Sequence, residues 1–128
     1  MDTPALSIII VSWNVRDLVL ACLDSIQADP ARPSLEVILV DNASADGTAE
    51  AVVQRYPDVR VLANHENVGF PRANNQALAH ASGRHVLYLN PDTEVGPGTL
   101  AACLDELDRN PDVGIAGCRL ESPDGDLQ

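Results

Sequence analysis

Leu6-Ser-Ile-Ile-Ile-Val11 is the stretch that decides the fold, because it is short, almost wholly apolar and rich in β-branched residues. Such a run is typical of a strand that is buried on both faces of a parallel sheet. Further short apolar runs follow along the chain at residues 35–40, 59–62, 85–89 and 113–117. We therefore predict five strands, of which residues 6–11 form the first.

Longer amphipathic segments separate these runs and predict helices at residues 16–28, 46–56, 71–82 and 97–109. Asn14 is a candidate N-cap for the first helix, and Ser44 or Asp46 for the second. Pro71 suits the first turn of the third helix, and Gly83 suits the position just past its end. Strands that alternate with helices form a mostly parallel sheet with helices on both faces, so we predict an α/β fold. Residues 1–128 are expected to form a single domain.

The composition excludes several classes of function. The net charge is −11, with 8 Lys+Arg against 19 Asp+Glu, so no nucleic-acid partner is expected. All eight cations are arginine, which excludes a P-loop because that motif needs a lysine on the phosphates. No apolar run approaches the ~20 residues that a transmembrane segment needs, and residues 1–15 do not resemble a signal peptide, so we expect a cytoplasmic protein. We interpret Cys22, Cys103 and Cys118 as small buried side chains, because each stands in an apolar stretch.

Polar and aromatic residues follow four of the predicted strands. Ligands bind beyond the carboxyl ends of the strands in an open parallel sheet, so these residues are the candidates for a site. They include the sole tryptophan and the sole phenylalanine of the chain, which offer flat surfaces to a nucleobase. The four stretches are Ser12-Trp13-Asn14, Asp41-Asn42-Ala43-Ser44, Asn64-His65-Glu66-Asn67-Val68-Gly69-Phe70 and Asn90-Pro91-Asp92-Thr93-Glu94.

Asp92 is the candidate metal ligand, because it directly follows a predicted strand in a rigid Asn-Pro-Asp turn. In a chain without lysine, a divalent cation held by one or two carboxylates can neutralise a diphosphate and take its remaining ligands from phosphate oxygens and water. Asp41 can accept hydrogen bonds from a base or a ribose. Both residues also have simpler interpretations, since Asp92 suits a turn that satisfies its own backbone and Asp41 can cap the loop that follows it.

Four motifs resemble those of the inverting glycosyltransferases of family 2, in particular the rhamnosyltransferase-like and galactofuranosyltransferase-like branch. Their order and spacing cover nearly the whole chain, which makes the combination specific although each motif alone is weak. The resemblance implies a Rossmann-like GT-A sheet that is truncated here, so that the chain is the N-terminal, nucleotide-sugar-binding part of a longer enzyme. The motifs are Ser7-Ile-Ile-Ile-Val-Ser-Trp-Asn14, Val40-Asp-Asn-Ala-Ser-Ala-Asp-Gly47, Asn67-Val-Gly-Phe-Pro-Arg-Ala-Asn-Asn75 and Leu89-Asn-Pro-Asp-Thr93.

The resemblance also implies roles for single residues. Asp41 is expected to contact the nucleobase, and the segment that contains Arg72 is expected to close over the nucleotide. Asp92 matches the last acidic position of the family's metal motif, while Asn90 stands where the family often has a first aspartate. An amide is a weaker ligand, so binding of Mn²⁺ or Mg²⁺ is expected to depend on the diphosphate. The predicted nucleotide site comprises Ser12, Trp13, Asn14, Asp41, Ser44, Asn67, Gly69, Arg72, Asn75 and Asn90.

The predicted reaction is the transfer of a sugar, such as rhamnose, from a dTDP- or UDP-linked donor to a cell-envelope glycan or lipid-linked acceptor. No residue of the chain is a convincing catalytic base, and the resemblance places that base beyond Gln128, in a parent enzyme at the inner face of the membrane. Two alternatives remain open, namely a sugar nucleotidyltransferase and a non-catalytic nucleotide-binding module. Trp13 and Arg72 also have alternatives, as a packing side chain and a solvated helix residue respectively.

Overall fold

A computed structural model describes residues 3–127 of the chain. The strands are β1 (Leu6–Ser12), β2 (Leu35–Asp41), β3 (Arg60–Ala63) and β4 (His85–Tyr88). The helices are α1 (Arg16–Gln27), α2 (Thr48–Arg55), α3 (Phe70–Leu78) and α4 (Thr99–Arg109). Strands and helices alternate along the chain, which confirms the predicted α/β class.

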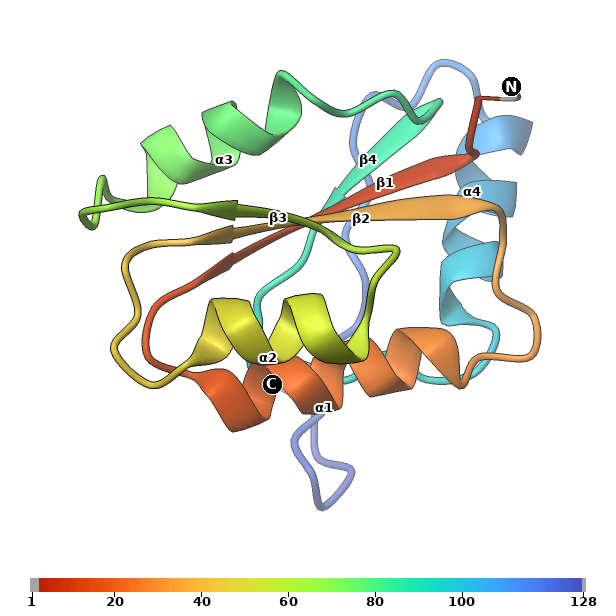
Figure 1. Cartoon of the computed structure of the whole chain (residues 1–128). Coiled ribbons are helices and arrows are strands. Elements are labelled where there is room, and N and C mark those ends of the chain that lie inside the picture. Colours follow the sequence, from red (N-terminus) through yellow and green to blue (C-terminus); the bar gives the residue numbers. More distant parts are fainter. Residues whose placement is uncertain (1–2, 128) are drawn as a thin grey trace.

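The four strands form one parallel sheet in the order β3-β2-β1-β4. β1 is central and all seven of its residues are buried, as its continuous apolar sequence predicts. Figure 1 shows α1 and α2 on one face of the sheet and α3 on the other. The larger core lies on the side of α1 and α2, and it also takes in Leu100 and Leu104 of α4. A smaller core joins Ala73 and Ala77 of α3 to β1 and β2.

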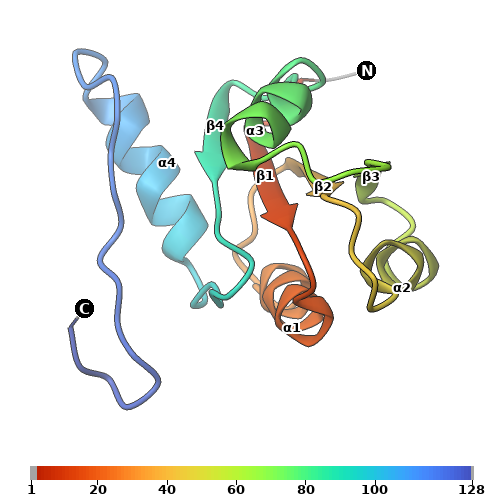
Figure 2. The ribbon, with the colours of Figure 1, turned by 90° about the vertical axis from the view of Figure 1, so that its left-hand side faces the viewer.

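The strand order places a switch point between β1 and β4. From β1 the chain adds β2 and then β3 on one side, and afterwards returns through α3 to place β4 on the other side of β1. In open α/β sheets, ligands bind outside the carboxyl ends of the strands at such a point. The arrowheads of β1, β2 and β3 point left in Figure 1, and Figure 2 looks onto that edge of the sheet. The edge is therefore where a site is expected.

The predicted fifth strand at residues 113–117 is wrong. These residues form no strand in the described part of the chain, and the side chain of Ile115 is 92% exposed. Figure 2 shows this segment running away from the sheet on the far side of α4. β-branched residues form a strand when a neighbouring strand pairs with their backbone. β4 pairs with β1 on one side, and residues 113–117 do not pair with its other side.

Several predicted helix ends also differ from the structure. Asn14 does not cap α1, which begins after Val15, and Gly47 rather than Ser44 or Asp46 is the N-cap of α2. α3 ends at Leu78, so Gly83 does not terminate it. Gly83 is instead packed against β1, where a β-carbon would stand 2.5 Å from the backbone nitrogen of Ser7.

The cysteines are only partly as predicted. Cys22 is buried, but Cys118 is exposed and Cys103 is half-buried. The sulfur atoms of Cys103 and Cys118 lie 3.2 Å apart, so these two thiols contact each other across α4 and the segment that follows it. The sequence alone did not indicate this contact, because Cys118 directly follows the segment 113–117 that was predicted to be a strand of the sheet.

Candidate functional site

Asp41 organises the carboxyl end of β2. Its Oδ1 accepts hydrogen bonds from the hydroxyl of Ser12 at 2.9 Å and from that of Ser44 at 2.6 Å, and its Oδ2 accepts the backbone N–H of Ser44 at 3.1 Å. The side chain is almost inaccessible, with 3% of Asp41 exposed. A carboxylate has about four acceptor positions, and these bonds use three of them.

Asn14 joins the loop after β1 to the loop after β2. Its backbone N–H donates to the Ser44 hydroxyl at 2.8 Å, and its side-chain oxygen accepts the N–H of Ala45 at 2.7 Å. Asn14 has a φ of 53°, a left-handed conformation that asparagine tolerates better than most residues. We refer to Ser12, Asn14, Asp41 and Ser44 as the Asp41 cluster, since hydrogen bonds connect all four.

Trp13 lies between two members of this cluster and does not pack into the core. Its side chain is 56% exposed, whereas the neighbouring Ser12 is buried. A large aromatic side chain that is held by rigid neighbours and open to solvent can stack on a flat ligand. The interpretation of Trp13 as a core-packing residue is therefore wrong, while its contact with a base stays a prediction.

Asn42 was not among the predicted site residues, although it connects β2 to the segment after β3. Its side-chain oxygen accepts from the amide of Asn64 at 3.0 Å and from the N–H of Val68 at 3.4 Å, and its amide donates to the carbonyl of Gly69 at 3.3 Å. Asn64 in turn exchanges two hydrogen bonds of 2.9 Å with Gln76 on α3. The only signal in the sequence was the position of Asn42 near the end of a predicted strand. The structure shows that Asn42 is buried, where an amide requires hydrogen-bond partners.

The segment that begins α3 is shaped by Asn67 and Gly69. The side-chain oxygen of Asn67 accepts the N–H of Gly69 at 2.8 Å, and Gly69 has a φ of 89°, which favours glycine. Arg72 and Asn75 lie further along on α3, and both are exposed. Phe70 is also 55% exposed, so the start of α3 presents an aromatic ring and a cation to solvent.

Asn90 and Asp92 follow β4, and both are exposed. The hydroxyl of Thr93 donates to the carbonyl of Asn90 at 2.7 Å and closes a turn around Asp92. Beyond the turn, the N–H of Val95 donates to the Ser25 hydroxyl of α1 at 2.9 Å. The segment after β4 is therefore held from α1, and within residues 3–127 the structure records no hydrogen bond that joins Asp92 to the Asp41 cluster.

Burial and hydrogen bonds shift the pKa of two groups near the site. Burial raises the pKa of the Cys22 thiol to about 11; a hydrogen bond with Thr93 opposes this shift, and the nearby carboxylates of Glu94 and Asp92 add to it. Both carboxylates thus lie within electrostatic reach of one side of α1. The hydroxyl of Thr48 donates to Asp46 and lowers the pKa of that carboxyl, and the N–H of Arg16 also contributes.

The residues present fit a divalent cation only in partnership with a ligand. Within the described residues, no three His, Cys, Asp or Glu side chains come together as a metal site. Asp92 offers one exposed carboxylate, with Glu94 two residues away. Mg²⁺ and similar ions are commonly bound by one or two carboxylates together with phosphate oxygens and water, which matches this donor set.

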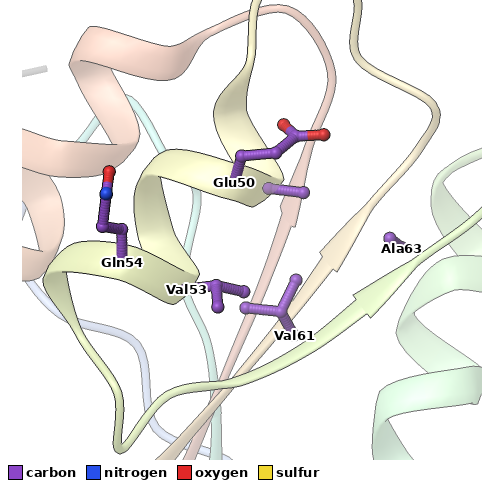
Figure 3. A pocket seen from close by; sticks show the side chains of 6 residues that line it. Glu50, Val53, Gln54, Val61 and Ala63 are labelled. Atoms are coloured by element: carbon purple, nitrogen blue, oxygen red, sulfur yellow. The ribbon is translucent and has the colours of Figure 1, made fainter.

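Two hollows on the surface lie away from these residues. One is a shallow groove between α2 and β3, and Figure 3 shows Val53 and Val61 facing each other across it. The other lies at the amino ends of the strands, near Leu35 and Val59. None of the predicted site residues lines either hollow, so the candidate site is the open carboxyl edge of the sheet.

The sequence model described as "Glycosyl transferase family 2" matches residues 7–128. The chain belongs to glycosyltransferase family 2. It is 34% identical over 136 residues to N-acetylglucosaminyl-diphospho-decaprenol L-rhamnosyltransferase of Mycobacterium tuberculosis, an alignment that covers 98% of this chain and 44% of that protein. It is 32% identical to the putative teichuronic acid biosynthesis glycosyltransferase TuaG of Bacillus subtilis, covering 95% of this chain and 50% of the relative.

A solved mannosyltransferase structure shares the fold. The mannosyltransferase PcManGT from Pyrobaculum calidifontis, solved in complex with GDP-Man and Mn²⁺, matches with a TM-score of 0.82 and 32% identity. That match covers 97% of this chain and 37% of the mannosyltransferase. The family assignment confirms the resemblance and the Rossmann-like GT-A class, and it does not favour a nucleotidyltransferase. The chain spans about half or less of the length of these relatives.

The structure connects some of the predicted site residues by hydrogen bonds and leaves others exposed. Hydrogen bonds bring together the Asp41 cluster, and Asn42 connects that cluster's strand to Gly69. The exposed residues Arg72, Asn75, Asn90 and Asp92 lie in segments that follow β3 and β4. The predicted base beyond Gln128 lies outside the described residues. None of the helices that the structure describes is long and apolar enough to cross a bilayer.

Proposed function

We propose that this chain binds the nucleotide-sugar donor of a glycosyltransferase, through its nucleoside diphosphate and a divalent cation. The observation that carries the proposal is the position of two carboxylates, one buried and one exposed, on the two sides of one switch point. The buried, hydrogen-bonded carboxylate of Asp41 ends β2 beside β1, and the exposed carboxylate of Asp92 follows β4 on the other side of β1. Ligands of parallel α/β sheets bind in this position.

The Asp41 cluster is proposed to receive the nucleoside. Ser12 and Ser44 hold the Asp41 carboxylate so that its remaining acceptor position can take a hydrogen bond from the base or the ribose. Trp13 supplies a stacking surface. Asn14 keeps the two loops at a constant separation, because it bonds to both Ser44 and Ala45.

The segment at the start of α3 is proposed to cover the nucleotide. Asn67 and Gly69 shape its first turn, and Arg72 is the cation nearest to that turn in the sequence. Asn75 lies one helical turn beyond Arg72, so both residues can face the same ligand. An arginine at this position compensates in part for the missing lysine, because its guanidinium can bind phosphate oxygens in a bidentate manner.

Asp92 is proposed to hold Mn²⁺ or Mg²⁺, with Asn90 beside it as a neutral ligand for the nucleotide. When bound, the cation supplies stabilisation of the negative charge that develops on the departing diphosphate. The chain's own contribution is to offer one carboxylate on a turn that Thr93 closes, and to leave the other coordination positions to phosphate oxygens and water.

The donor is proposed to be a dTDP- or UDP-linked sugar, such as a rhamnose donor, and the acceptor a cell-envelope glycan or lipid-linked saccharide. The name of the mycobacterial relative, a rhamnosyltransferase that acts on a diphospho-decaprenol, supports this choice. The relative from Pyrobaculum calidifontis binds GDP-Man, so the nucleotide is the part of the proposal that most needs a direct measurement. We propose that the whole enzyme inverts the configuration at the anomeric carbon. The catalytic base is likewise proposed for the whole enzyme.

Titration calorimetry with UDP and dTDP, with and without Mn²⁺, tests the proposal. We expect weak binding that requires Mn²⁺ and is lost by more than about tenfold in Asp92→Ala, since a lost charged ligand contributes well over 1.4 kcal/mol. Asp58→Ala is the matched control, because Asp58 is an exposed carboxylate at the opposite edge of the sheet. Equal affinity of Asp92→Ala and Asp58→Ala would refute the metal assignment.

A further inference from the structure

α1 presents three polar side chains towards the segment that follows β4. Cys22, Ser25 and Asp29 are spaced by three and four residues, which places them on one side of α1 and its C-terminal extension. Ser25 and Asp29 accept backbone N–H groups of this segment, at Val95 and Gly98 respectively. A hydrogen bond with Thr93 partly opposes the rise in the pKa of the Cys22 thiol that burial causes. Figure 2 shows this segment descending from β4 between α1 and α4. The family motifs do not include any of the three residues.

Ser25 makes the central contact. Its hydroxyl donates to the carbonyl of Cys22 at 2.7 Å, which leaves its lone pairs directed away from the helix. The N–H of Val95 donates to the same hydroxyl oxygen at 2.9 Å, across seventy positions of the sequence.

Asp29 makes the contact furthest from β4. Its Oδ1 accepts the N–H of Gly98 at 3.1 Å and that of Ala31 at 3.0 Å. Asp29 is 5% exposed, and its Oδ2 is buried without a hydrogen-bond partner among the described residues. Burying a carboxylate with an unsatisfied oxygen is unfavourable. Gly98 is the N-cap of α4, so the charge of Asp29 is stabilised in part by the positive end of that helix.

Residues 90–97 are thus fixed at both ends. Leu89 holds the first end, because its N–H donates to the carbonyl of Ile9 at 2.9 Å in β1. Ser25 and Asp29 hold the other end through Val95 and Gly98. Asp92 lies between these anchors, and its carboxylate is exposed, so the path of the backbone decides where that carboxylate stands.

We propose that Ser25 and Asp29 are positioning residues, which set the path of residues 90–97 and thereby place the Asp92 carboxylate for a cation bound to a diphosphate. The assignment rests on the proposed function for the identity of the cation site. A positioning role differs from a general contribution to stability. Removal of a positioning residue must weaken cation binding at Asp92, while the base still binds at the Asp41 cluster.

Amide hydrogen exchange in the unliganded chain tests the anchors directly. In Ser25→Ala we expect the Val95 amide to exchange about fivefold faster or more, as the loss of one hydrogen bond implies. Ser25→Thr retains the hydroxyl and is expected to restore slow exchange. Ser34→Ala is the matched control, because Ser34 likewise accepts a backbone N–H, that of Ala5 at 2.9 Å, but at the amino edge of the sheet. Unchanged Val95 exchange in Ser25→Ala would overturn the proposal.

Mn²⁺ binding in the presence of UDP, followed by electron paramagnetic resonance, tests the positioning role. We expect Ser25→Ala and Asp29→Ala to weaken Mn²⁺ binding about fivefold to tenfold, with Ser34→Ala unchanged. Asp29→Asn retains the Oδ1 acceptor and is expected to keep Mn²⁺ binding, and Ser25→Ala carries the test if Asp29→Ala does not fold. Faster exchange at Val95 with unchanged Mn²⁺ affinity would overturn the positioning role. Failure of the unsubstituted chain to bind Mn²⁺ and UDP would overturn the proposed function instead. Hydrogen exchange would still show whether Ser25 holds the Val95 amide.

Discussion

The substitution Asp41→Ala separates the structural contribution of this carboxylate from its proposed contact with the nucleoside. It removes the acceptor of three hydrogen bonds, from the hydroxyls of Ser12 and Ser44 and from the N–H of Ser44. Ser12 is 1% exposed, so its hydroxyl cannot turn to water once the carboxylate is gone. Ser44 is only half-buried and can be hydrated.

The expected loss follows from these two environments. A buried donor left without a partner costs about 1–3 kcal/mol, and the rehydrated Ser44 groups add about 1 kcal/mol between them. We therefore expect Asp41→Ala to lower the free energy of unfolding by about 2–4 kcal/mol. Domains of this size are typically stable by about 5–15 kcal/mol, so the variant is expected to remain folded at neutral pH.

Urea unfolding followed by circular dichroism measures this loss. The double variant Ser12→Ala, Asp41→Ala removes both partners of the buried bond, so its loss is expected to be smaller than the sum of the single losses by about 1–2 kcal/mol. Calorimetry on the folded variants should show weaker UDP binding in Asp41→Ala than in Ser12→Ala. Additive losses in the double variant, or an Asp41→Ala loss below about 0.5 kcal/mol, would show that the bond does not carry this stability.

Two further predictions concern the amino edge of the sheet. Gly83→Ala is expected to lower stability by about 1–3 kcal/mol in thermal unfolding, because its β-carbon would stand 2.5 Å from the Ser7 backbone nitrogen; Gly114→Ala, with open space around it, is the control, and equal effects of the two would contradict the packing account. Burial raises the pKa of Glu36, but hydrogen bonds from Ser82 and Ser7 outweigh it and lower this pKa below 4.5. A lowered folded-state pKa means that the stability is present above the unfolded value and is lost as the pH falls through the folded value. Acid unfolding should therefore lose part of its dependence on pH below about 4.5 in Glu36→Gln, and an unchanged profile would exclude Glu36 as its source.

The elements of the fold could be predicted from local patterns wherever burial repeats along the chain. β1 and β2 are apolar runs whose last five or more residues are buried, and α1 buries the face that its spacing marks. The prediction failed at residues 113–117, a short run that includes two glycines and that no strand among the described residues pairs with. It also failed at Gly83, whose conformational signal for a helix end was outweighed by a close contact with Ser7.

The candidate site shows the same division. Its residue types could be chosen from the stretches that follow each strand, and the Asp41 cluster confirms that the stretches after β1 and β2 meet. Asn42 and Asn64 stand in the candidate stretches but receive no role from the sequence, because an amide in a loop looks the same in sequence whether it is solvated or buried in a network. No sequence pattern indicated a role for Ser25 and Asp29, since their partners at Val95 and Gly98 are about seventy residues away.

The sequence by itself determined the alternation of strands and helices, the acidic and lysine-free character of the chain, and the family to which its motifs point. These properties depend on residue type and on spacing within a few turns, which a single chain displays directly. The tertiary structure decided the strand order, the switch point beside β1 and the anchoring of the Asp92 segment on α1. Those features depend on contacts between residues far apart in the chain, and such contacts are selected by the packing of the whole sheet rather than by any local pattern.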